Sequence, residues 1–245
     1  MKRIEMLGTP MHVATMSETV EFIKRRVLAG QFTQHVVVNV AKIVNMRKDP
    51  MLREGVAECD IINIDGMGVV WGARLLGHEV PERVAGVDLF LELIAMSADN
   101  DLPVFLLGAK SEIVNRTKEN LEAIHPKLQV AGVHDGYFSE DEEEGVVRQI
   151  RESGARLMFV AITSPKKEIF INRWGNQLGV DFVMGVGGTF DVVSGMTKRA
   201  PVWMQNWGLE WLYRIIQEPR RMWKRYLVTN SKFAWLLLRA KLGMS

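Results

Sequence analysis

The sequence predicts an α/β protein with a doubly wound, mostly parallel sheet and a helical C-terminal appendage. Two patterns indicate this fold class. Up to about residue 195, short apolar runs alternate with longer segments of helical periodicity, which is typical of parallel strands joined by helices. From Trp203 onward the pattern is helical throughout, so the appendage follows the alternating segment.

The predicted strands are short apolar runs, as expected when helices cover both faces of a parallel sheet. They span His35–Asn39, Asp60–Ile64, Val104–Leu107, Gln129–Val133, Leu157–Ile162 and Asp181–Met184. Ligands of such sheets bind beyond the carboxyl ends of the strands, so the residues that follow each strand become candidates for a site.

Helices are predicted over 17–29, 40–58, 67–76, 87–99, 111–124, 140–153 and 165–178. Ser139 followed by Glu142 forms a capping box at the start of one of them. In the appendage, helices are expected over 203–217 and 220–241, because Pro219 disfavours helix at the residue before it.

The charge distribution divides the chain into a body, residues 1–195, and an appendage, residues 196–245. The appendage holds ten Lys or Arg and two acids, a net charge of +8, whereas the whole chain carries +2, so the body carries about −6. Five of the seven Trp also lie in the appendage. This composition predicts an anionic partner for the appendage: a membrane surface, a nucleic acid or a phosphorylated substrate. The alternative is a basic helix that packs on the acidic body or in a homo-oligomer.

Several classes of protein are disfavoured by the sequence. It has no apolar leader typical of a signal peptide and no apolar run long enough to span a bilayer, which fits a cytoplasmic protein. A lone Cys59 excludes an internal disulfide, and the five His show no zinc-type spacing, so we expect no metal and no cofactor. Neither a P-loop nor a dinucleotide fingerprint is present, which disfavours an NTPase or a hydride-transfer enzyme.

Small or polar residues follow all six predicted strands. The candidate positions for a bound nucleotide are Asn39, Gly108, Gly136, Tyr137, Lys167, Glu168, Gly185, Gly187, Gly188, Phe190 and Asp191. The loop 185–188 resembles a turn through which backbone approaches a phosphate, with Phe190 and Asp191 within reach of a base or ribose. Glycine at a strand end is also an ordinary turn former, so the argument rests on the whole set.

Asp65 is the candidate catalytic base. It follows an apolar strand and precedes Gly66, so its carboxylate is expected to project beyond the sheet, where backbone can approach a ligand closely. A partly desolvated carboxylate has a raised pKa and can accept a proton from a hydroxyl nucleophile. The competing interpretation is an ordinary Asp-Gly turn.

The appendage supplies candidate groups for a diphosphate and for a membrane. The cations expected to meet a diphosphate are Arg199, Arg214, Arg220 and Arg221. Trp223, Trp235 and Leu236 are expected at a lipid surface, because a basic amphipathic helix with Trp and Leu is typical of the membrane interface.

With these motifs in order, the chain resembles the WecG/TagA/CpsF glycosyltransferases, a bacterial family that builds cell-envelope polysaccharides. The resemblance covers most of the chain and rests on residues 65–68, 82–88, 105–108, 136–138, 165–168, 185–191, 199–201, 208–211 and 218–221.

The resemblance implies a Rossmann-like core and a peripheral membrane protein at the inner face of the plasma membrane. The implied reaction is a metal-independent, inverting transfer of a hexose from a UDP-sugar to a polyprenyl-diphosphate-linked saccharide. Asp65 matches the family's base, Asn39 and Arg83 match residues of the sugar-nucleotide pocket, and Arg214 and Arg221 match arginines that meet the diphosphate. The appendage is expected to close over the site.

Two positions depart from the family pattern. Val37 stands where Thr is common, and Lys167 stands where Gln is usual. We therefore expect a donor that differs from the N-acetylmannosamine type. The sequence does not fix the sugar, so nucleotides of N-acetylmannosamine, glucose or a uronic acid all stay alternatives. The departures also leave open a non-catalytic relative that binds a nucleotide sugar. Nucleic-acid binding through the basic appendage is the weakest hypothesis, and we expect no nucleic-acid partner.

Overall fold

The computed structural model describes residues 1–244, apart from the side chain of Arg221. Within this part of the chain, the strands form one eight-stranded sheet in the order β1-β2-β4-β3-β8-β7-β5-β6, and every pairing except β1 with β2 is parallel. The strands are β1 (Lys2–Met6), β2 (Thr9–Val13), β3 (Thr33–Val38), β4 (Ile61–Ile64), β5 (Val104–Gly108), β6 (Val130–His134), β7 (Leu157–Ala161) and β8 (Phe182–Gly185). The predicted α/β fold is confirmed.

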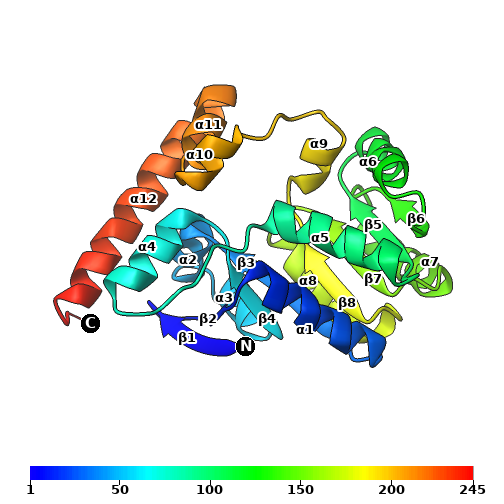
Figure 1. Cartoon of the computed structure of the whole chain (residues 1–245), viewed down its shortest axis with the longest axis horizontal. Helices are drawn as coiled ribbons and strands as arrows, with labels where there is room; N and C mark the ends of the chain where they lie inside the picture. The colour runs from blue at the N-terminus through cyan, green and yellow to red at the C-terminus, as the bar shows by residue number, and fades with distance from the viewer. Residues whose placement is uncertain (245) are drawn as a thin grey trace.

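Helices cover both faces of the sheet (Figure 1). Along β5, Val104 and Leu106 belong to a core formed with one group of helices, while Phe105 and Leu107 belong to a core on the opposite face. This alternation is what a doubly wound sheet requires. The helices of the body are α1 (Met16–Leu28), α2 (Val40–Met46), α3 (Pro50–Ala57), α4 (Met67–Leu75), α5 (Gly86–Asp99), α6 (Ser111–Ile124), α7 (Glu143–Glu152), α8 (Lys166–Trp174) and α9 (Thr189–Val193).

The β1–β2 hairpin and the short α9 were not predicted from the sequence. Leu7 and Gly8 make the hairpin turn, both with positive φ, at 54° and 73°. β1 is an edge strand in which only Ile4 and Met6 are buried, so its signal is a short alternation of apolar and charged residues. Such a pattern is weak beside the continuous apolar runs of the central strands.

Two predicted helices are each divided in the structure. The segment 40–58 forms α2 and α3, because Asp49 caps α3 by accepting a hydrogen bond from the Leu52 amide at 3.0 Å and Pro50 begins the new helix. The segment 203–217 forms α10 (Val202–Asn206) and α11 (Glu210–Gln217), separated at Gly208, whose φ is +69°.

The appendage ends in α12 (Pro219–Lys241), a helix of 23 residues that packs beside α2 and α4. Figure 1 shows α10, α11 and α12 at one end of the molecule, opposite β6 and α7. Phe233 of α12 is buried in the core formed by β3, β4 and their helices. Among the described residues, no helix combines the length and the apolar character needed to cross a membrane.

Candidate active site

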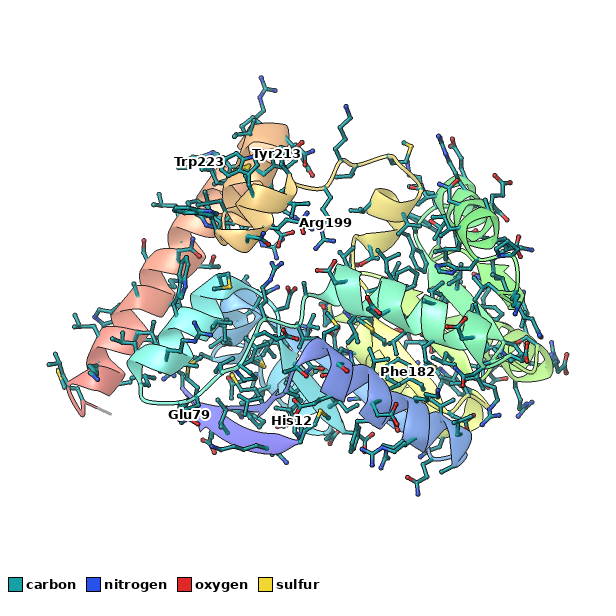
Figure 2. The ribbon with its side chains drawn as sticks, in the orientation of Figure 1. His12, Glu79, Phe182, Arg199, Tyr213 and Trp223 are labelled. Carbon is teal, nitrogen blue, oxygen red and sulfur yellow. The ribbon has the colours of Figure 1, made fainter. Side chains whose placement is uncertain are left out.

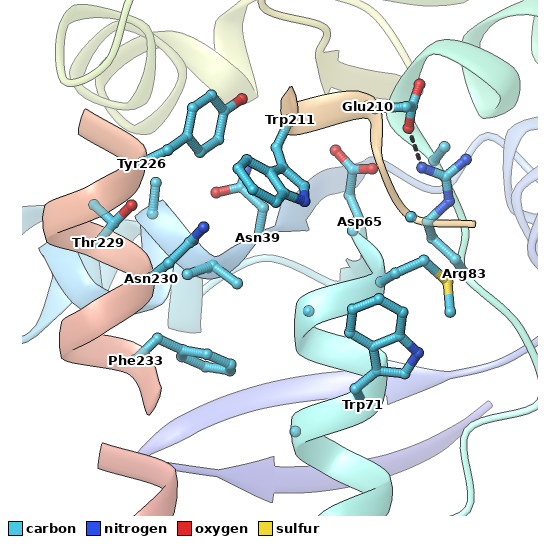
Figure 3. A pocket seen from close by; sticks show the side chains of 18 of the residues that line it. Asn39, Asp65, Trp71, Arg83, Glu210, Trp211, Tyr226, Thr229, Asn230 and Phe233 are labelled. Carbon is cyan, nitrogen blue, oxygen red and sulfur yellow. Dashed lines mark hydrogen bonds and ion pairs between the residues drawn. The ribbon is translucent and has the colours of Figure 1, made fainter. Parts of the chain in front are cut away.

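A cavity of about 510 Å³ lies between the carboxyl ends of β3 and β4 and the appendage. The body contributes Asn39, Asp65 and Arg83, and the appendage contributes Arg199, Glu210 and Arg214, among others. Arg225 of the appendage also lines this space. Among the described residues, the lining therefore includes four arginines and two carboxylates. Figure 3 shows Asp65 facing this space, with Glu210 and Trp211 of the appendage across it.

Backbone geometry at the end of β4 positions Asp65. All four residues of β4 are buried, and the Asp65 amide donates to the Val38 carbonyl of the neighbouring β3 at 2.8 Å. Gly66 follows with φ of +107°, a conformation that strongly favours glycine, and turns the chain directly into α4. The carboxylate is thus held at the sheet edge by a rigid strand and an abrupt turn.

Arg83 is brought to the same edge by the segment that precedes α5. The Val84 amide donates to the Ile64 carbonyl at 3.0 Å, so this segment is fixed against the end of β4. The Arg83 guanidinium donates to the Glu210 carboxylate of α11 and forms an ion pair with it. Both side chains are largely buried, with 13% and 27% of their surfaces exposed.

A second contact of this kind joins Arg199 to the body. Its two terminal nitrogens donate to the two carboxylate oxygens of Asp88 at the start of α5, the longer bond being 2.8 Å. The Arg199 Nε also lies 3.5 Å from Glu210 Oε1. Figure 2 shows Arg199 pointing inward from the connection between α9 and α10. Glu210 therefore bridges two arginines, one from the body and one from the appendage. These ion pairs hold the appendage against the body at the cavity.

Burial raises the pKa of Asp65 from its ordinary value of 3.8 to about 6. In this balance Arg83 and Arg214 act to lower the pKa, while the carboxylates of Glu210 and Asp88 act with burial to raise it. A carboxyl group with this pKa is ionised near neutral pH and is a much stronger base than an exposed aspartate.

Lys167 and Glu168 lie in a separate buried cluster with Lys42 of α2. Glu168 Oε1 lies 3.3 Å from Lys167 Nζ and 3.6 Å from Lys42 Nζ, and it accepts a hydrogen bond from Ser164 at 2.9 Å. Burial and the charge of Lys167 lower the pKa of Lys42 to about 8. Although burial acts in the other direction, the two ammonium groups hold the pKa of Glu168 below its usual range.

The remaining predicted nucleotide positions do not line the cavity. Gly185 accommodates the stem of Lys167, since a Cβ there would meet Lys167 Cε at 2.6 Å. Gly108 lies against the Ala161 backbone, and a Cβ there would come within 2.5 Å of it. Phe190 is fully buried in the core, which corrects its prediction as a residue that contacts a base or ribose. Gly136, Tyr137, Gly187, Gly188 and Asp191 lie at or just beyond the carboxyl ends of β6 and β8, along the same edge of the sheet as Asp65.

The predicted residues of the appendage include residues that line the cavity, residues that are exposed to solvent and one that is buried. Arg199 and Arg214 line the cavity, whereas Arg220 is exposed and does not. Trp223 and Trp235 are about half exposed, but Leu236 is buried at 9%, which corrects its prediction as a lipid-facing residue. The side chain of Arg221 lies outside the described residues.

The contributors to the cavity that were not predicted include the charged or polar residues Glu210, Arg225 and Tyr226. Glu210 had a signal in the sequence, because it is one of only two acids among the last fifty residues, which hold ten Lys or Arg. Among residues 1–244, no group of three or more His, Cys, Asp or Glu side chains is placed to hold a metal ion.

The fold and the cavity together define an α/β protein with a half-buried aspartate of raised pKa and an arginine-rich chamber at its sheet edge, covered by helices. The chain belongs to the glycosyl transferase WecG/TagA/CpsF family, whose family model matches residues 4–245. The family resemblance read from the sequence is therefore confirmed over nearly the whole chain, and the protein is a member of a glycosyltransferase family.

Proposed function

We propose that this protein transfers a hexose from a UDP-sugar to a saccharide carried on a polyprenyl diphosphate, with inversion at the anomeric carbon. The observation that carries the proposal is the position of Asp65, a half-buried carboxylate of raised pKa at the edge of an arginine-lined cavity. The uridine and ribose would lie along the glycine-rich ends of β5 to β8. The sugar would then reach Asp65 beneath the appendage.

The chemistry is a single displacement. Asp65 takes the proton from the acceptor hydroxyl as its oxygen bonds to the anomeric carbon from the face opposite the leaving group. The bond from that carbon to the diphosphate oxygen breaks, and its electron pair leaves with UDP. Arginines such as Arg83 and Arg214 compensate the charge that develops on the diphosphate, since guanidinium groups pair with phosphate in a bidentate manner.

The pH dependence of kcat/KM tests the role of Asp65. Only the ionised carboxylate accepts a proton, so kcat/KM falls as the pH drops through a midpoint near 6, far above that of an exposed aspartate. Glu210→Gln shifts the midpoint to lower pH, because Glu210 raises the pKa of Asp65. An acid limb near pH 4, or one that Glu210→Gln does not move, contradicts this assignment.

The donor is proposed to differ from the N-acetylmannosamine type. Lys167 and Lys42 both pair with the carboxylate of Glu168 in their buried cluster. This cluster carries a net charge of one positive unit when both lysines are protonated. Val37 lies beside Gly86 at the start of α5, where a Cβ on the glycine would lie 3.5 Å from Val37 Cγ2, and it has no side-chain hydrogen-bonding group. These features favour a donor that lacks the acetamido group or carries a carboxylate.

Membrane association is proposed through the outer surface of α10, α11 and α12, at the inner face of the plasma membrane. This surface exposes large apolar side chains: Val202, Trp203, Trp207, Leu212, Ile216, Trp223, Leu227, Trp235 and Leu238. Figure 2 shows Trp223 at the upper end of the appendage. Aromatic and apolar groups beside lysines and arginines suit an anionic lipid interface.

Vesicle flotation tests this surface. Trp223→Glu combined with Trp235→Glu is expected to release most of the protein from vesicles that contain anionic lipid, because two apolar contacts are replaced by charges of the same sign as the lipid. The matched control is Ile124→Glu on α6 of the body, whose side chain is 65% exposed. Equal losses in both variants would show that the appendage is not the lipid-binding surface.

A further inference from the structure

The cavity that holds Asp65 continues as a slot between α4 and α12. Along α12, its lining residues recur about every four positions, which places them on one face of the helix. Their character changes steadily: Arg225 and Tyr226 come first, then Thr229 and Asn230, and finally Phe233, Ala234 and Leu237. The lining thus changes from charged to polar to apolar over roughly 18 Å, the rise of twelve helical residues.

The opposite side of the slot is formed by α4. Gly68 and Gly72 are four residues apart on one face of this helix and line the slot without side chains. A Cβ at Gly72 would lie 3.0 Å from Phe233 Cζ and 3.1 Å from Leu237, so glycine lets these side chains of α12 approach the α4 backbone. Trp71 and Leu75 complete the wall and are about half exposed. Figure 3 shows Trp71 and Phe233 on either side of the slot.

This gradient matches a ligand with an anionic head and a hydrocarbon chain. The head end has four arginines against two carboxylates, while the far end offers Trp71, Leu75, Phe233 and Leu237, side chains that give a sugar few hydrogen bonds. The apolar end also leads toward Trp235 and Leu238, which are exposed on the same helix. A chain leaving the slot would therefore meet the surface proposed to contact lipid.

We propose that the slot between α4 and α12 binds the first isoprenoid units of the polyprenyl-diphosphate acceptor, drawing them out of the bilayer so that the acceptor's diphosphate lies against Arg225. This inference rests on the proposed function and adds to it a binding site for the hydrocarbon chain. The slot selects acceptors by their chain as well as by their sugar, and it holds the acceptor hydroxyl at a fixed depth relative to Asp65.

Two soluble probes isolate the contribution of the chain: methyl diphosphate, which has only the head, and farnesyl diphosphate, which adds three isoprene units. Binding is measured by calorimetry without detergent, below the concentration at which farnesyl diphosphate forms micelles. The wild-type protein is expected to bind farnesyl diphosphate at least about tenfold more tightly, because buried methylene groups each strengthen binding several-fold.

Ala234→Glu removes this preference, because it places a carboxylate in the apolar end from an exposed helix position. Leu75→Glu does the same from the opposite wall. The matched control is Ala240→Glu, which adds the same charge to an exposed position of α12 outside the cavity and keeps the preference. If the substitutions at positions 234 and 240 reduced the preference for farnesyl diphosphate equally, the proposed binding site in the slot would be wrong.

Acceptor-dependent release of UDP is followed in parallel, so that failure of the slot and failure of the proposed function are distinguishable. A wild-type protein that transfers sugar but binds the two diphosphates equally overturns the slot and leaves the function standing. One that prefers farnesyl diphosphate but never releases UDP supports the slot and overturns the function.

Discussion

Asp65→Asn is expected to abolish sugar transfer, with a loss in kcat on the order of 10³ or more, while UDP still binds. Asparagine keeps the shape of the side chain but cannot take a proton, and general bases typically contribute 10²- to 10⁴-fold. The measurement pairs acceptor-dependent UDP release with calorimetric titration of UDP. A variant that keeps near-normal rates would show that Asp65 is not the base.

The same variant is expected to be more stable than the wild-type protein at neutral pH. The folded state raises the pKa of Asp65 to about 6, above the unfolded value of 3.8, so ionisation of this group costs free energy of unfolding as the pH rises through that interval. The gain is about 1–3 kcal/mol above pH 6 and disappears below pH 3.8. Thermal unfolding at several pH values measures it. An inactive variant of lower stability at pH 7 would indicate a structural role for Asp65.

Arg214→Gln is expected to lower kcat by about 10²-fold, because its guanidinium lines the cavity and lies close enough to Asp65 to lower the pKa of that residue. The effect should fall on kcat more than on the KM for the donor, since the charge on the diphosphate grows as the bond to UDP breaks. Steady-state kinetics with a soluble acceptor measures both parameters.

Arg220→Gln is the matched control, since Arg220 is an exposed arginine of the appendage that does not line the cavity. It is expected to change kcat less than about threefold in the absence of lipid, as is usual for a surface substitution remote from a site. Equal losses at positions 214 and 220 would mean that the overall charge of the appendage, and not its geometry, supports catalysis.

The central part of the fold was predictable from the sequence because its signal is local. The strands β3, β4, β5, β7 and β8 are largely buried, so each stands out as an apolar run between helical segments. The edge hairpin β1–β2 has no such signal, because its outer strand faces solvent on one side. The break between α10 and α11 depends on Gly208, which packs against Met67 and Trp71 of the body, a tertiary contact that periodicity alone does not reveal.

The candidate site likewise contains residues that local sequence could predict and residues that depend on tertiary contacts. Asp65 and Asn39 follow buried strands, so their place at the sheet edge was predictable from sequence. The bridge from Arg83 through Glu210 to Arg199 was not, because it joins residues more than 110 positions apart and depends on how the appendage folds back. Gly185 has a structural role that the sequence did not reveal: the absence of a side chain there leaves room for the stem of Lys167, and its predicted place in a phosphate loop stays a prediction.

The central claim is tested most directly by acceptor-dependent release of UDP from a panel of UDP-hexoses, with a short-chain polyprenyl-diphosphate saccharide as acceptor. We expect at least one donor to give UDP and a product whose anomeric configuration is opposite to that of the donor, and we expect UDP-N-acetylmannosamine not to be the best of them. UDP binding without release from any donor would contradict the account and would make this protein a non-catalytic member of its family.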